Sequence, residues 1–137
     1  MAERDLEILL STLKVIRRPG VWRYRTTSSR GLGMVLAMGA SRGFGFYSKM
    51  LIQEREGVTA IVPAKAKTPP DNRWIWLELS VYSDLHAVGF MAAVAKALAE
   101  ADVPCNAVAG FHHDHIFVPE DKVEAAIAAL EALSERS

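Results

Sequence analysis

The fold is decided by residues 74–119, which read WIWLELSVYSDLHAVGFMAAVAKALAEADVPCNAVAGFHHDHIFVP. The opening residues alternate between a wholly apolar face and a mixed face, which is typical of a strand that covers a core. Ser83 and Asp84 are good N-cap residues for the helix that follows. The pattern predicts strand, helix, strand, strand and helix over residues 74–82, 85–101, 105–111, 115–118 and from 119 onward. This order lacks only the last strand of the ferredoxin-like βαββαβ plan.

The first half of the chain contains weaker patterns of the same kinds. Leucines and an isoleucine at helical spacing predict an amphipathic helix over residues 4–16. Residues 21–27 alternate as a strand with one wet side. A β-hairpin is expected over residues 49–62, where Gly57 supplies the positive φ of the turn. Residues 28–48 are glycine-rich, and we expect a loop there with a short strand at MVLAM.

A polar linker with two prolines, AKAKTPPDN, divides the chain at residues 64–72. The charge changes sign there, because residues 1–70 hold 12 Lys and Arg against 5 Asp and Glu, whereas residues 71–137 hold 4 against 11. We therefore predict an α+β protein of two related halves, each an antiparallel sheet with helices on one face. The predicted domains are residues 1–68 and 71–137.

Length and composition narrow the class of protein. A chain of 137 residues buries roughly two-thirds of its unfolded surface, which is enough for a core without metals or disulfides. The single cysteine, Cys105, excludes an intramolecular disulfide and favours a reducing cytoplasm. The first residues do not have the pattern of a secretory signal. Glu78 and Lys96 interrupt the apolar runs, so no membrane segment is predicted.

The segment Ser83–Gly89 is the most suggestive candidate for a binding site. It is predicted to lead from a strand end into a helix N-terminus, where free backbone N–H groups favour an anion such as the carboxylate of an amino acid. Gly89 lets a ligand approach closely, although close packing of a neighbouring strand would explain it equally well.

The turn HHDH is the most reactive-looking cluster. His113 and His115 are predicted to lie on the same side of a strand, where both could reach a metal such as zinc, and Asp114 could orient one of them. A catalytic zinc needs a third protein ligand, which the spacing does not identify. A polar turn with hydrogen-bonding imidazoles, including that of His112, is the favoured interpretation.

These residues carry a resemblance to a known family. Leu85–Gly89, Asn106–Gly110 and His113–Val118 resemble the motifs of small bacterial proteins built from two ACT-like domains. The first half is similar more loosely, in Pro19-Gly20 before an aromatic strand and in the turn Glu54–Thr59. The sequence departs from the family pattern at three places, because residues 28–48 are longer, Asp84 replaces a second serine, and His86 and Met91 are unusual.

The resemblance implies βαββαβ-type domains that pair side by side, with a small ligand, often an amino acid, bound at the interface between ACT-like units. Asp84 or Asp114 is expected to hold its ammonium group. The residues that the resemblance places at the ligand are Ser83, Asp84, Leu85, His86, Ala87, Val88, Gly89, Asn106, Ala107 and Val108.

We therefore predict a non-catalytic, homodimeric regulatory or sensor protein of the cytoplasm, with no cofactor and no bound metal. It is not expected to bind nucleic acid or a membrane. One alternative is a metal-dependent enzyme centred on residues 112–115. Another is nucleic-acid binding through the basic first half, which would weaken steeply with salt.

Overall fold

The computed structural model describes residues 2–28 and 48–137. The middle of the predicted glycine-rich loop, residues 29–47 with the expected short strand, lies outside this description. Contacts divide the chain into two compact units, of which unit 1 is Met1–Pro19 with Trp74–Ser137 and unit 2 is Gly20–Arg73. The predicted domain division at residues 68 and 71 stays a prediction.

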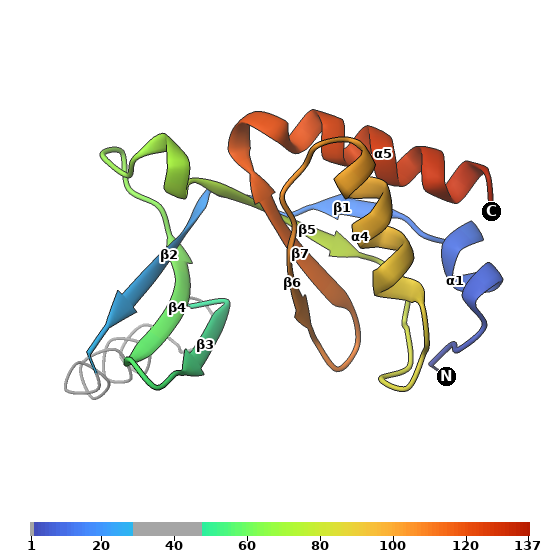
Figure 1. The fold of residues 1–137 in the computed structure, drawn as a ribbon, viewed down its shortest axis with the longest axis horizontal. Coiled ribbons are helices and arrows are strands. Elements are labelled where there is room, and N and C mark those ends of the chain that lie inside the picture. Colours follow the sequence, from blue (N-terminus) through green and yellow to red (C-terminus); the bar gives the residue numbers. More distant parts are fainter. Residues whose placement is uncertain (1, 29–47) are drawn as a thin grey trace. The chain divides into compact units, whose positions relative to one another are not determined.

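Unit 1 is built on an antiparallel sheet of four strands (Figure 1). In spatial order they are β1 (Val15–Arg17), β5 (Trp74–Leu79), β7 (Asp114–Pro119) and β6 (Asn106–Ala109). The register places Leu77 opposite Ile116 in the centre of the sheet. Apolar residues therefore alternate onto one face, as the sequence pattern of residues 74–79 predicts.

Strand β1 occupies the position of the last βαββαβ strand, and it comes from the N-terminus rather than the C-terminus. Its residues pair with β5, with Val15 opposite Leu79 and Ile16 opposite Glu78. The predicted helix over residues 4–16 is therefore wrong in its second half. Helix α1 spans only Leu6–Ser11, because β-branched Val15 and Ile16 favour a strand and an open edge of β5 is available to pair with them.

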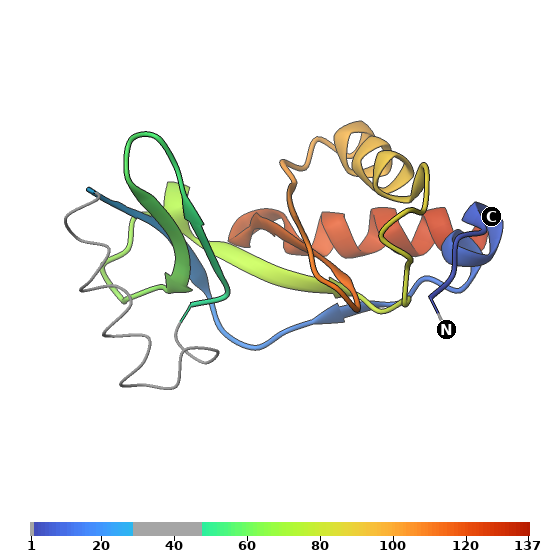
Figure 2. The same ribbon diagram turned by 90° about the horizontal axis from the view of Figure 1, so that it is seen from below.

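Helices α4 (Phe90–Glu100) and α5 (Val123–Glu135) cover one face of this sheet (Figure 2). Short 3₁₀ turn η3 (Glu120–Lys122) leads into α5. The side chains that meet between helices and sheet are almost wholly buried: Ile75, Leu77, Leu79, Val94, Leu98, Ile116, Val118, Ala126 and Leu130. The predicted α+β arrangement with helices on one face is confirmed in this unit.

Two predicted boundaries near the candidate site are wrong. Strand β5 ends at Leu79 instead of residue 82, and α4 begins at Phe90 instead of residue 85. Gly89 explains the late start, because it takes the left-handed conformation (φ +95°) that other residues avoid and that does not continue a helix. Asp84 caps a short turn instead, in which the Ala87 N–H donates to the Asp84 carbonyl at 2.9 Å.

Unit 2 contains an antiparallel sheet in the order β2 (Trp22–Thr27), β4 (Val58–Pro63) and β3 (Met50–Gln53). The predicted hairpin is confirmed. Gly57 has φ +149°, and a Cβ atom there would overlap the carbonyl oxygen of Thr27, so only glycine fits.

The linker after β4 holds 3₁₀ turn η2 (Pro70–Asn72), and the Asn72 side chain both accepts from and donates to the Tyr24 backbone at 2.9 Å.

Among residues 2–28 and 48–137, none of the helices has both the length and the apolar character that crossing a membrane requires.

Candidate functional site

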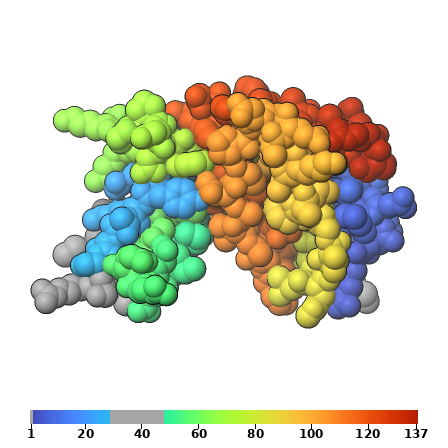
Figure 3. Space-filling model, viewed as in Figure 1, coloured from blue at the N-terminus to red at the C-terminus, as the bar shows by residue number. Residues whose placement is uncertain are grey.

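The loop between β5 and α4, residues 80–89, is held in place by the N-terminal segment. The Glu3 N–H donates to the Tyr82 carbonyl, and the Asp84 N–H donates to the Glu3 carbonyl, each at 2.8 Å. Figure 3 shows the loop at the surface between the N-terminal segment and the β6–β7 hairpin. The predicted ligand segment is therefore fixed by residues far from it in sequence.

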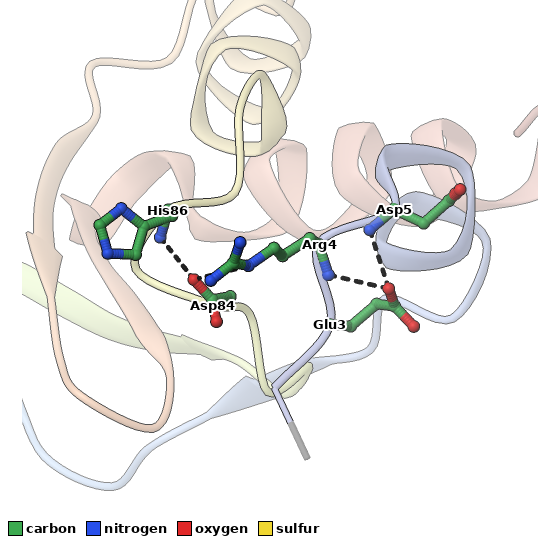
Figure 4. Close-up of polar contacts among 5 residues, drawn as sticks. All are labelled: Glu3, Arg4, Asp5, Asp84 and His86. Carbon is green, nitrogen blue, oxygen red and sulfur yellow. Dashed lines mark hydrogen bonds and ion pairs between the residues drawn. The ribbon is translucent and has the colours of Figure 1, made fainter.

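Asp84 is the electrostatic centre of this loop (Figure 4). Its Oδ1 atom accepts the His86 N–H at 2.7 Å and lies 3.2 Å from Nε of Arg4. The backbone hydrogen bond from His86 is the main reason that the pKa of Asp84 is lowered, and the Arg4 guanidinium adds to it. The Glu3 carboxylate in turn accepts the backbone N–H groups of Arg4 and Asp5. The loop thus presents an ionised carboxylate beside a guanidinium.

A cavity of about 230 Å³ opens beside this ion pair. Ser83 is almost buried at its base, and its hydroxyl donates to Oδ2 of Asp114 at 2.8 Å. The His112 ring packs against those of Phe111 and Tyr82, with ring centroids 5.2 and 5.4 Å away. The lining residues come from the N-terminus, the loop and the hairpin tip: Ala2, Tyr82, Ser83, Asp84, Leu85, His86 and Phe111.

The other groups of the HHDH turn have separate partners. Nδ1 of His113 lies 3.3 Å from the Val81 carbonyl oxygen, and Nδ1 of His115 accepts the indole N–H of Trp76 at 2.9 Å. The Asp114 carboxylate accepts the hydrogen bond from the Ser83 hydroxyl. Across the part of the chain that the structure describes, no three His, Cys, Asp or Glu side chains converge as a metal site would require. This arrangement agrees with the interpretation as a hydrogen-bonded polar turn.

Comparison with known proteins identifies the family. Residues 1–67 and residues 73–132 each match a family model described as an ACT domain. The chain is a tandem ACT-domain protein. The predicted resemblance and the two ACT-type halves are thereby confirmed. A search of functionally curated proteins finds no match.

Solved structures support the same fold. A Vibrio cholerae protein of unknown function, titled a possible transport protein, is 29% identical, with a TM-score of 0.76 over 94% of this chain and 95% of that one. The regulatory subunit of aspartate kinase from Thermus flavus is 13% identical, with a TM-score of 0.64 over 87% and 95% of the two chains. The aspartate kinase of Clostridium acetobutylicum is 10% identical, with a TM-score of 0.71 over 93% of this chain and 36% of that enzyme.

The tandem ACT-domain structure gathers some of the predicted site residues and separates others. Ser83, Asp84, Leu85 and His86 line the cavity, and Asp114 contacts it through Ser83. Ala87, Val88 and Gly89 do not line it. Residues 106–108 do not line it either, because they lie in β6, where they pair with β7.

Sequence reasoning missed two aromatic walls of the cavity. Tyr82 follows the end of β5, and Phe111 is a large apolar residue in an otherwise polar hairpin turn, with 68% of its surface exposed. That exposed phenylalanine among histidines was the available signal, because a polar turn has no structural need for it.

The predicted helix N-terminus at residues 83–89 is wrong. The backbone N–H groups of Asp84, His86 and Ala87 already have acceptors within the loop and the N-terminal segment. The uncapped first turn of α4 starts one residue after Gly89 instead. Any anion at the cavity would therefore depend on side chains more than on bare amides.

Proposed function

We propose that this chain is a non-catalytic regulatory protein that binds an amino acid or a similar small metabolite in the cavity beside Asp84. The observation that carries the proposal is the pair formed by the ionised Asp84 carboxylate and the Arg4 guanidinium at 3.2 Å. An amino acid has an ammonium and a carboxylate group at a fixed short separation, so it complements such a pair. The cavity volume of about 230 Å³ suits a small metabolite rather than a drug-sized ligand.

Regulation would follow from the way the cavity is assembled. The loop, the N-terminal segment and the hairpin tip each contribute to it, and backbone bonds between Glu3 and the loop join two of them. A ligand that contacts all three would stabilise one arrangement of these segments. Ligand binding would then change the affinity of the protein for an effector partner, and the partner would change the affinity for the ligand by the same factor. The regulatory subunit of aspartate kinase among the structural neighbours is consistent with such a role.

The reactive side chains support a non-catalytic role. Burial raises the pKa of the Cys105 thiol, which reduces the thiolate available for nucleophilic attack. His113, Asp114 and His115 are engaged in contacts that hold the hairpin and sheet. Their geometry does not favour the metal-dependent alternative.

We also propose that a second copy of the chain covers the open side of the cavity. Leu85 and Phe111 line the cavity and are exposed by 63 and 68%, and Val88 of the same loop is exposed by 84%. Exposed apolar patches of this kind mark interaction surfaces. Within unit 1, β6 pairs with β7 alone, so its other edge, carrying Asn106–Val108, is available to a partner strand.

Isothermal titration with each of the twenty amino acids tests the proposed function. We expect heat from at least one of them, with binding weakened about tenfold or more in Asp84→Asn and in Arg4→Ala, because each loses one charge of the pair. Asp102→Asn is the matched control, since it removes the exposed ion pair with Lys122 far from the cavity and should leave binding unchanged. The absence of heat from every amino acid would reject amino acids as the ligands of this cavity.

A further inference from the structure

The walls of the cavity carry information about the ligand beyond its charged groups. Tyr82, Leu85 and Phe111 contribute two aromatic rings and one aliphatic side chain to the lining. His112 packs edge-on against Phe111 and tilted against Tyr82, so it contacts both rings. Leu85 and Phe111 remain more than half exposed. Contact with an apolar group of a ligand would remove these apolar surfaces from water, which is favourable.

The charges around the cavity disfavour other side chains. Asp84 lines the cavity, and the Arg4 guanidinium lies beside Asp84 without lining it. If Arg4 pairs with the α-carboxylate of the ligand, an acidic ligand side chain would lie near the Asp84 carboxylate without a lysine or arginine of its own. A second ammonium group, as in lysine, would have to leave water for the walls formed by Tyr82, Leu85 and Phe111. Uncharged apolar side chains incur neither penalty.

We propose that the ligand of this site is an amino acid with an apolar or aromatic side chain, which lies against Tyr82, Leu85 and Phe111. This inference rests on the proposed function and adds the class of ligand to it. Asp84 takes the ammonium through Oδ2, which is not used in its bonds to His86 and Arg4. Arg4 takes the carboxylate through its terminal nitrogens, since its Nε is the atom that lies 3.2 Å from Oδ1 of Asp84.

Titration calorimetry with L-phenylalanine, L-leucine, L-aspartate and L-lysine tests the class of ligand. We expect phenylalanine or leucine to bind at least about tenfold more tightly than aspartate or lysine. Phe111→Ala should weaken phenylalanine binding about tenfold, because it removes an aromatic wall. Ile8→Ala is the control, because Ile8 is also exposed and apolar but does not line the cavity. Unchanged thermal unfolding midpoints show that both variants fold.

The outcomes separate this inference from the function on which it rests. If aspartate or lysine binds most tightly, the class of ligand is wrong and the regulatory function stands. If phenylalanine binds Phe111→Ala as tightly as the wild type, the assigned wall is wrong. If no amino acid gives heat, the class of ligand proposed here fails, and amino-acid binding in the proposed function fails with it.

Discussion

At the scale of single residues, His115 is the clearest case of a side chain whose chemical state the structure determines. The indole N–H of Trp76 can only donate, so Nδ1 of His115 must be unprotonated to accept it. Arg18 lies 4.9 Å above the Trp76 ring and 3.6 Å from Glu78. The charged and titratable groups that influence the imidazole are Glu78, His113, Asp114 and Arg18.

The neutral state of His115 predicts a dependence of stability on pH. Burial is the main cause that lowers the pKa of His115 below its ordinary 6.5. The unfolded chain therefore binds this proton more readily, so His115 destabilises the fold as pH decreases below about 6.5, and the effect levels off below its lowered pKa. Urea denaturation between pH 7.5 and roughly 5 measures it.

His115→Gln should reduce that pH dependence, because glutamine can still accept from Trp76 but does not titrate in this range. His86→Gln is the comparison variant, because it replaces an exposed histidine outside the sheet. An equal slope in the His115 variant and the wild type would show that the Trp76 contact does not govern the titration.

At the scale of elements, strand β1 completes the sheet of unit 1, and every second residue of β1 forms backbone hydrogen bonds with β5. The Ser80 N–H donates to the Lys14 carbonyl, and the Arg18 N–H donates to that of Trp76. Hydrogen-bonded pairs alternate along an antiparallel ladder, so the backbone N–H and C=O of Ile16 point toward Glu78 in β5. The N–H of the preceding residue, Val15, points away from β5.

A pair of proline substitutions tests the role of β1. Ile16→Pro removes a donor that the ladder needs and should lower the free energy of unfolding by about 1–3 kcal/mol. Val15→Pro removes an N–H that faces away from β5, so it should be the milder change. Chemical denaturation compares the two, and amide exchange at Glu78 reports on the ladder directly. A larger loss from Val15→Pro would contradict this register.

The elements also show what could be predicted from sequence. Alternation within residues 74–79 predicts their strand, and the Gly57 turn predicts the hairpin of residues 49–62, because both signals are local. The pattern over residues 4–16 predicts helix, but Val15 pairs with Leu79, and only that distant partner makes it a strand. For the site, the strand end before Ser83 points to Ser83–His86, although the helix N-terminus expected there begins only at Phe90. Tyr82 and Phe111 as walls depend on where the hairpin folds, which the local pattern does not contain.

At the scale of the whole molecule, the exposed apolar surface around the cavity predicts self-association. Size-exclusion chromatography with light scattering should give about twice the 15.0 kDa of one chain. Val88→Glu should shift the protein toward the monomer, because Val88 is 84% exposed and its charge would have to be buried in the interface. Ile8→Glu, an exposed apolar position on α1, should leave the mass unchanged. A monomeric wild type at tens of micromolar would contradict the dimer.

The origin of β1 also has a consequence for biosynthesis. Residues 15–17 leave the ribosome before their partners at residues 77–79, which follow only after all of unit 2 has been translated. The nascent N-terminal segment must therefore wait unpaired, and contacts this distant in sequence slow folding. Because the Ser134 hydroxyl in α5 also donates hydrogen bonds to the carbonyls of Ser11 and Leu13, the docking of this segment is completed only after α5 has been translated as well.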